Sequence, residues 1–253
     1  MRSFLLAVLF LLSPAASAAG AADPLESARW GDMQRLFFKD APVAFDPRVK
    51  VVSPKVAEDA MNVPVSVTVE GLEGVREVLV FADFNPILKV LSFQPAQAKP
   101  SLGFRMKLQQ SSPIRAAART ADGVWHVGGT WVETSGGGCT VPSAGRAAGQ
   151  WDRLLGQVQG RVWDRSEGDL RVRLKVIHPM DTGLAAGIPA FYIERLTLAD
   201  EQGTRFMEID TFEPVSENPV FTFDIDPKLA PQGDLTLTGV DNNGNRIAAR
   251  IPR

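Results

Sequence analysis

Cys139 is the residue whose type and setting point most directly to chemistry. It is the single cysteine of the 253-residue sequence and directly follows three glycines, Gly136, Gly137 and Gly138. Successive glycine N–H groups can form a concavity that favours the thiolate, which is the nucleophilic form of cysteine. Glycines carry no side chains with which to build a pocket, and they are costly to order. The pattern therefore predicts a reactive thiol on an exposed, flexible arm, with a buried structural cysteine as the alternative.

The two histidines, His126 and His178, are the other candidates for chemistry with Cys139. One cysteine and two distant histidines lack the tight local spacing of zinc sites. A catalytic thiol must also be held rigidly beside its base, which a glycine arm does not do. We therefore expect both histidines to be structural or surface residues, and we expect no metal site.

No motif in the sequence indicates an enzyme with its own turnover. It has no phosphate loop, dinucleotide fingerprint or nucleophile elbow, so we expect no catalytic residues and no cofactor. The formal net charge of −2 argues against a nucleic-acid partner, since phosphate binding needs concentrated Lys and Arg. With 45% hydrophobic residues, the chain can build sizeable cores.

The N-terminus has the pattern of a secretory signal peptide. Arg2 precedes an apolar run from Phe4 to Leu12, and the small residues Ala16-Ser17-Ala18 follow. The run is shorter than the ~20 residues that a membrane span needs. We expect a cleaved signal at residues 1–18, no membrane span and a periplasmic mature protein, with a retained anchor as the alternative. One exported cysteine cannot form an internal disulfide, so it is free for chemistry or for linking a homodimer.

Short strands dominate the first half, which we assign as a domain over residues 24–135. Residues 24–39 have helical spacing of apolar positions, and Val63, Val65, Val67 and Val69 alternate with polar or small residues as in a half-buried strand. Turn signals such as Asn85-Pro86 separate further strands, expected at 75–81, 89–93, 104–108, 114–118 and 125–132. Such spacing is typical of a β-sandwich.

The second half repeats this design after a glycine-rich linker. Residues 136–149 have no periodicity and read as the cysteine arm, and residues 150–163 have helical spacing. Asn243-Gly244 predicts a hairpin with a type I′ turn. The remaining strands of this second domain, residues 150–253, are expected at 170–177, 190–198, 205–211, 220–225, 234–240 and 246–251. The prediction is an all-β protein with two sandwiches in tandem.

The first half contains an ordered set of short stretches at residues 56–59 and 62–67, Asn85-Pro86, the strand 104–108, Ala121-Asp122-Gly123 and the Gly-Gly-Gly-Cys at 136–139. In this set it resembles SoxY, the sulfur-carrying subunit of the periplasmic thiosulfate-oxidising system. The second half contains a further ordered set at 178–183, 188–193, 216–219 and 241–244. In this set it resembles SoxZ, the partner subunit of SoxY.

The whole chain is therefore similar to fused SoxYZ-like proteins, a group associated with quinoprotein dehydrogenases of methanol-dehydrogenase type. The resemblance implies two immunoglobulin-like sandwiches and a sulfur-containing group carried on Cys139 between periplasmic enzymes. Two departures restrict this reading. The chain continues beyond the cysteine, and Thr140-Val141 stand where SoxY has two glycines. An arm fixed at both ends reaches less far than a free one.

Two functions follow from these observations. The first is a periplasmic covalent carrier, with Cys139 as attachment point, Gly136, Gly137 and Gly138 as its arm, and the sandwiches as docking surfaces for sulfur-oxidising or redox enzymes. The second is a non-covalent binding or assembly module for a quinoprotein dehydrogenase and its cytochrome, in which Cys139 is dispensable.

Overall fold

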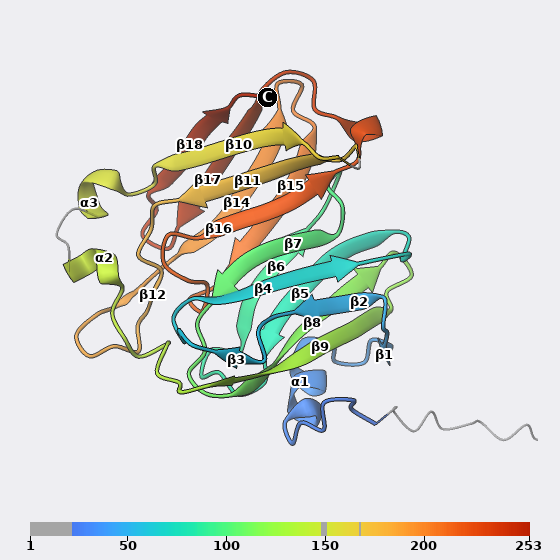
Figure 1. Ribbon diagram of the computed structural model, residues 1–253, viewed down its shortest axis with the longest axis vertical. Coiled ribbons are helices and arrows are strands. Elements are labelled where there is room, and N and C mark those ends of the chain that lie inside the picture. The colour runs from blue at the N-terminus through green and yellow to red at the C-terminus, as the bar shows by residue number, and fades with distance from the viewer. Residues whose placement is uncertain (1–21, 148–150, 167) are drawn as a thin grey trace, which may run out of the picture.

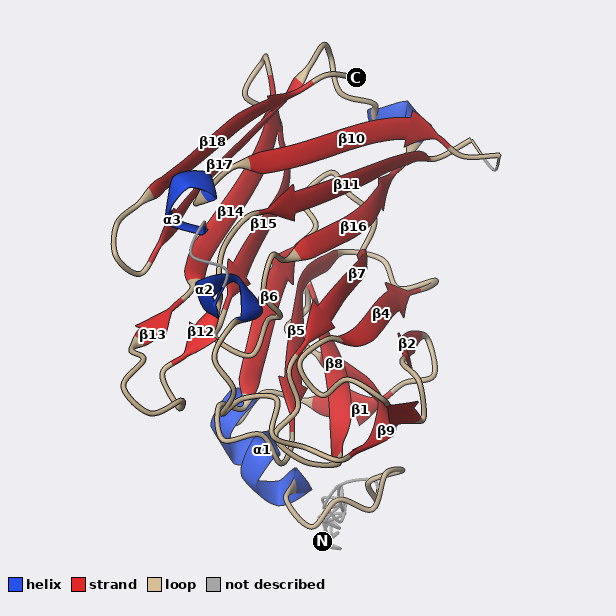
Figure 2. Cartoon of the chain, turned by 60° about the vertical axis from the view of Figure 1, so that its left-hand side comes forward, coloured by secondary structure: helices blue, strands red, loops and turns tan. Residues whose placement is uncertain are grey.

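The computed structural model describes residues 22–147, 151–166 and 168–253 (Figure 1). The predicted signal peptide, residues 1–18, lies outside the described residues. No helix in these ranges is long and apolar enough to cross a membrane. Strands dominate both halves, which confirms the predicted all-β class with sandwich-like halves (Figure 2).

The first half consists of one helix and a series of strands. These are α1 Trp30–Phe37, β1 Val43–Phe45, β2 Val49–Val52, β3 Val56–Ala57, β4 Val63–Val69, β5 Val75–Ala82, β6 Lys89–Gln94, β7 Ser101–Met106, β8 Ser112–Thr120 and β9 Trp125–Thr134. The alternation from Val63 to Val69 has its predicted effect, because every second side chain of β4 is buried.

The second half begins with two short helices and continues in strands. These are α2 Ala144–Ala147, α3 Trp151–Leu154, β10 Val158–Asp164, β11 Leu170–Val176, β12 Asp181–Thr182, β13 Ala190–Phe191, β14 Ile193–Asp200, β15 Arg205–Thr211, β16 Val220–Ile225, a 3-10 helix Pro227–Leu229, β17 Leu235–Asp241 and β18 Arg246–Ile251.

The two halves are joined by strand pairing rather than by the glycine-rich segment alone. One sheet has the order β1-β9-β8-β5-β6-β15-β14-β17-β18, with β3 on β9, and the other has the order β10-β11-β16-β7-β4-β2. Antiparallel pairing of β6 with β15 places Phe93 opposite Ile209, and β7 meets β16 at Gly103 and Thr222. Both sheets therefore run from one half into the other.

The larger of two hydrophobic clusters among the described residues follows these continuous sheets. Buried side chains from β4, β5 and β7 belong to the same cluster as those from β11, β14 and β16. The rings of Phe93 and Phe223 meet across the junction with centroids 6.4 Å apart. Burial of this apolar surface holds the halves together as one body.

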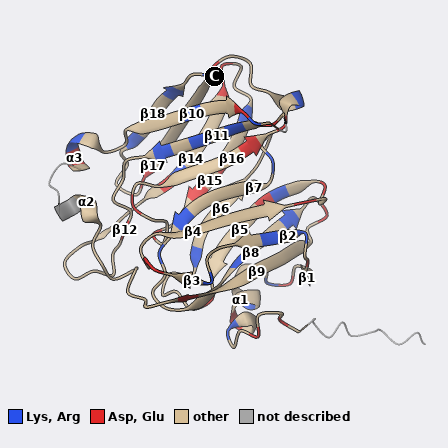
Figure 3. Cartoon of the chain, in the orientation of Figure 1, with Lys and Arg blue, Asp and Glu red and all other residues tan. Residues whose placement is uncertain are grey.

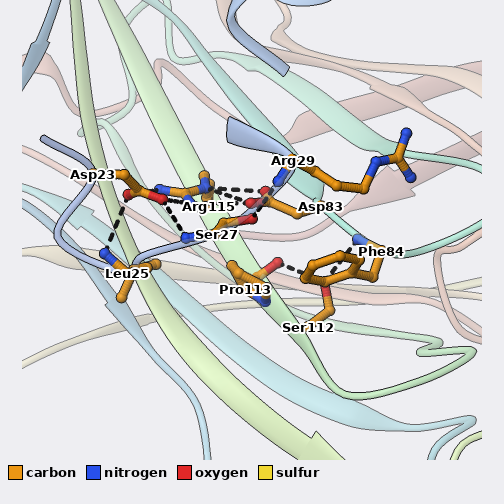
Figure 4. Close-up of polar contacts among 9 residues, drawn as sticks. All are labelled: Asp23, Leu25, Ser27, Arg29, Asp83, Phe84, Ser112, Pro113 and Arg115. Atoms are coloured by element: carbon orange, nitrogen blue, oxygen red, sulfur yellow. Dashed lines mark hydrogen bonds and ion pairs between the residues drawn. The ribbon is translucent and has the colours of Figure 1, made fainter. Parts of the chain in front are cut away.

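The N-terminal segment is fastened to the first half by a buried ionic cluster (Figure 4). Arg115, 1% exposed, binds Asp83 at 3.0 Å and Asp23 at 2.6 Å. Asp23 also accepts hydrogen bonds from the backbone N–H groups of Leu25 and Ser27. Because these bonds hold residues 23–27 in turns, the helix begins only at Trp30, and the predicted span 24–39 was too long.

Two local predictions in the second half were wrong. The helix expected at 150–163 ends at Leu154, since Gly156 has a φ of +74° and the chain then continues as β10, paired with β11. The hairpin at Asn243-Gly244 does form, but a type I′ turn needs positive φ at both residues and only Gly244 has it, at +82°. The carboxylate of Asp241 accepts the backbone N–H groups of Asn243 and Asn245 and holds this alternative turn.

Candidate functional site

The segment that carries Cys139 is ordered and lies against the first sandwich. The N–H of Gly137 donates to the carbonyl of Gln109 at 3.0 Å, and that of Gly138 to the carbonyl of Leu108 at 3.0 Å. The N–H of Cys139 donates to the side-chain oxygen of Gln109 at 3.2 Å. The prediction of a flexible, exposed arm was therefore wrong for residues 136–139.

The glycines serve close approach between backbones. Gly136 and Gly137 have φ values of +82° and +85°, which side chains disfavour. A Cβ atom on Gly138 would lie 2.1 Å from the carbonyl oxygen of Ala60 and 2.8 Å from that of Leu108. The absence of side chains, which suggested freedom, instead permits tight packing beside Cys139.

Cys139 itself is fully buried, with 0% of its surface exposed. Its sulfur lies 3.9 Å from the carbonyl oxygen of Lys107. Burial raises the pKa of the thiol to about 11, and the positive charge of Lys107 opposes this rise. The expected preference for the thiolate was therefore wrong for this conformation, in which the sulfur is a protonated, shielded thiol.

Lys107 brings an ammonium group into the same buried region. It is 2% exposed, and its Nζ donates a hydrogen bond to the carbonyl oxygen of Met180. Burial lowers the pKa of Lys107 to about 8, although Cys139, Asp181 and Glu217 act in the opposite direction. Nothing in the sequence distinguished this lysine, because lysines are rarely buried. The sequence pointed to it only indirectly, because Lys107 lies in the SoxY-like strand 104–108 and its partner Met180 lies in the SoxZ-like stretch 178–183.

The second half closes over Cys139 through the stretch 178–183. Oγ1 of Thr182 donates to the carbonyl oxygen of Cys139 at 2.5 Å. Asp181 accepts the N–H of Ser143 at 3.2 Å, which fixes the chain just beyond the cysteine. Cys139 therefore lies between the two halves, with Lys107 and Gln109 on one side and Met180 and Thr182 on the other.

The histidines do not form a metal centre with Cys139. His126 binds Asp46 at 2.8 Å, and its other ring nitrogen lies 3.4 Å from Thr120. His178 is buried and accepts the N–H of Met180 at Nδ1, and burial lowers its pKa to about 4. Within the described ranges, no group of three or more His, Cys, Asp or Glu residues could hold a metal ion.

The described site provides a thiol, an amine and hydrogen-bond donors, but it closes them off from solvent. A thiol in this setting can store a proton and resist oxidation while the segment is in place. The sulfur must become exposed before it can react, and the hydrogen bonds of Cys139 with Gln109 and Thr182 oppose this exposure.

Comparisons with known proteins place the two halves in two families. Residues 33–139 match the family of the sulfur oxidation protein SoxY, and residues 162–252 match that of the sulphur oxidation protein SoxZ. No curated protein matches the chain.

Two solved structures show similarity to parts of the chain. The sulfur carrier protein SoxY from Chlorobium limicola f thiosulfatophilum is 21% identical over 42% of this chain and 96% of its own, with a TM-score of 0.37. The superoxide reductase (neelaredoxin) from Ignicoccus hospitalis is 20% identical over 34% of this chain and 80% of its own, with a TM-score of 0.29. The two family matches follow one another along the chain, with residues 140–161 between them, and together cover most of it. They show that this chain belongs to the SoxYZ-like proteins, in which a SoxY domain and a SoxZ domain are fused.

Proposed function

We propose that this chain is a sulfur-compound carrier that holds a covalent intermediate on Cys139 and presents it to partner enzymes. One observation carries the proposal: the single cysteine of the sequence is the last residue of the SoxY match, 33–139, and lies where the SoxY and SoxZ halves meet. The family supports carriage rather than turnover. The signal-like pattern of residues 1–18 supports export to the periplasm.

The buried thiol gives this carrier a closed state. Its release breaks the hydrogen bonds from Thr182 and to Gln109, after which the pKa of the exposed thiol returns toward its ordinary range. The open thiolate can then form an S–S bond with a sulfur oxyanion. With thiosulfate, this bond releases the thiol proton and two electrons, which a redox enzyme of the same compartment accepts.

The test is intact-mass spectrometry of the full chain, before and after incubation with tetrathionate. Tetrathionate transfers a sulfane-sulfonate group to a thiolate and releases thiosulfate, so no further oxidant is needed. We expect one adduct on the wild type, located at Cys139, and none on Cys139→Ser. Protein purified from its native periplasm should carry a related adduct. If Cys139 is always unmodified there and Cys139→Ser supports sulfur oxidation normally, the carrier function is wrong.

The complete burial of Cys139 favours a second candidate, in which the cysteine only fills the junction. In this case the chain is a non-covalent binding or assembly module for a quinoprotein dehydrogenase system. Cys139→Ala would then retain partner binding and activity in vivo. The same Cys139→Ala strain thus separates the two candidates, since a carrier loses all function without its sulfur.

A further inference from the structure

A groove crosses the outer face of the sheet formed by β10, β11, β16, β7, β4 and β2, where the two halves join. This sheet faces the viewer in Figures 1 and 3. Strand register places one continuous row of residues across it: Arg161, Arg173, Thr222, Gly103, Ser66 and Val52. The groove has a volume of about 540 Å³.

Small residues keep the middle of this row low. Gly103 has no side chain, and Thr222 and Ser66 on either side of it are short. Beyond Ser66 the floor turns apolar, with Pro64 in the lining and Val52 64% exposed. The result is a hollow with a partly apolar floor. It lies where β7 and β16 pair through Gly103 and Thr222.

Two arginines of the lining have free guanidinium groups. Arg105 and Arg173 are exposed, and across the described ranges neither has a carboxylate within ion-pair distance. By contrast, their neighbour Arg171 binds Asp224 at 2.7 Å. Lys175, two residues beyond Arg173, adds a third cation without an ion pair among the described residues. Figure 3 shows this run of basic residues along β11.

We propose that this groove binds an acidic segment of a partner protein in extended conformation. Strands lie about 4.8 Å apart, so a row across six strands spans about 24 Å, which about seven or eight extended residues cover. Carboxylates of the segment pair with Arg105 and Arg173, and an apolar side chain rests beside Val52. A hollow with few cations suits a peptide better than an anionic membrane, which is recruited by larger basic clusters.

The position of the groove ties docking to both halves and to the buried thiol. Arg173 and Thr222 belong to the second half, whereas Gly103 and Arg105 belong to the first. Two residues beyond Arg105, the same chain reaches Lys107, whose carbonyl contacts Cys139. A bound segment therefore lies on the strand that leads into the site.

The experiment measures fluorescence anisotropy of two labelled peptides of about eight residues, titrated with the full chain. One alternates Asp and Glu with Leu and Thr, and the other carries Lys in place of each acid. We expect the acidic peptide to bind and the Lys peptide not to bind, and we expect the affinity for the acidic peptide to fall as the salt concentration rises. Arg105→Glu and Arg173→Glu should each weaken binding at least tenfold. Arg76→Glu should leave it unchanged, because Arg76 is an exposed arginine of β5 on the other sheet that has no ion pair among the described residues.

Three results would overturn the proposal. These are no binding of the acidic peptide by the wild type, equal binding of the Lys peptide, and an equal loss in Arg76→Glu. Phosphatidylglycerol vesicles form a parallel arm, and vesicle binding that Arg105→Glu abolishes, without peptide binding, would assign the groove to a membrane surface instead. Circular dichroism of each variant confirms that the fold is retained.

Discussion

The carbonyl oxygen of Lys107 lies 3.9 Å from the sulfur of Cys139, and the ammonium group of the same lysine is buried, with its charge acting on that thiol. The lysine lowers the pKa of the thiol and the thiol raises the pKa of the lysine, while burial moves each pKa in the opposite direction. A proton donor and a potential anion are thus enclosed together at the junction of the two halves. This pairing makes both the reactivity of Cys139 and the stability of the fold depend on pH.

Gly138→Ala should open the site. The new Cβ would lie 2.1 Å from the carbonyl oxygen of Ala60, so the segment must move away from the first sandwich. We expect the rate of Cys139 alkylation by iodoacetamide at pH 8 to rise on the order of tenfold, with a loss of about 1–3 kcal/mol in the free energy of unfolding. The rate is followed by intact-mass spectrometry.

Gly137→Ala is the matched control. Its φ of +85° makes the substitution cost about 1–2 kcal/mol. No atom lies within 4 Å of the new Cβ, so nothing forces the segment to move. It should lose comparable stability while its alkylation rate stays near that of the wild type. Equal acceleration in both variants would show that global destabilisation, rather than local opening, controls access to the thiol.

Lys107→Met should stabilise the protein at neutral pH. The pKa of Lys107 is lowered from about 10.5 to about 8, so the unfolded state holds this proton more tightly than the folded state. Below pH 8 the destabilising effect of the buried Lys107 charge has its full size, and it disappears as pH rises to about 10.5. An apolar side chain of similar size removes it, which we expect to add about 1–3 kcal/mol to the unfolding free energy at pH 7 and little at pH 10.5.

The measurement compares urea unfolding of Cys139→Ser with that of the double variant Lys107→Met/Cys139→Ser at both pH values. The serine background removes the opposing effect of the thiol. In the wild type, burial raises the pKa of Cys139 from about 9 to about 11, so the free energy of unfolding falls as pH rises from about 9 to about 11. A methionine variant that is less stable than its parent at pH 7 would contradict the prediction.

Regular alternation in the sequence predicted the strands well. The strand from Val63 to Val69 matches its expected bounds, because burial of every second side chain is a local property. The expected bounds 205–211 and 220–225 match as well. Most other strands differ by a few residues at their ends. The paired sheets across the junction were not predicted, since the pairing of β6 with β15 joins residues more than a hundred positions apart.

The candidate site was only half predictable for the same reason. Cys139 was identified by its uniqueness and its glycines, but its burial depends on Thr182, 43 residues later, and on carbonyl groups near Lys107. Glycine runs serve both flexible linkers and close backbone contacts, and the sequence does not separate these uses. The close contacts of Gly136 with Gln109 and of Gly138 with Ala60 show which use applies.

His178 should make the protein sensitive to mild acid. Its pKa is lowered from about 6.5 to about 4, so protonation favours the unfolded state. Its contribution to stability is complete above pH 6.5 and is lost as pH falls toward 4, by about 3 kcal/mol at most. In His178→Asn, Oδ1 can accept the Met180 N–H in place of Nδ1. Urea unfolding at pH 7.5 and 4.5 should show a smaller loss in the variant, and equal losses would rule out His178 as the cause.

Arg115→Met should release the N-terminal segment and strongly destabilise the first half. Asp83 is 0% exposed and pairs with Arg115 at 3.0 Å, so its carboxylate would be left buried without a cation. Breaking such a buried pair costs about 3–5 kcal/mol. Trypsin should then cleave after Arg29 and Arg35 faster than in the wild type, and the urea midpoint should fall.

Asp23→Asn separates the effect of the Arg115 cluster on attachment of the N-terminal segment from its effect on the stability of the first half. It weakens the 2.6 Å ion pair of Asp23 with Arg115, which attaches the N-terminal segment. The pair of Arg115 with Asp83 stays intact. We expect faster cleavage after Arg29 with a clearly smaller shift of the urea midpoint than in Arg115→Met. If both variants keep the wild-type midpoint and cleavage rate, the cluster is not what fastens this segment, and the apolar contacts of Trp30 and Met33 suffice.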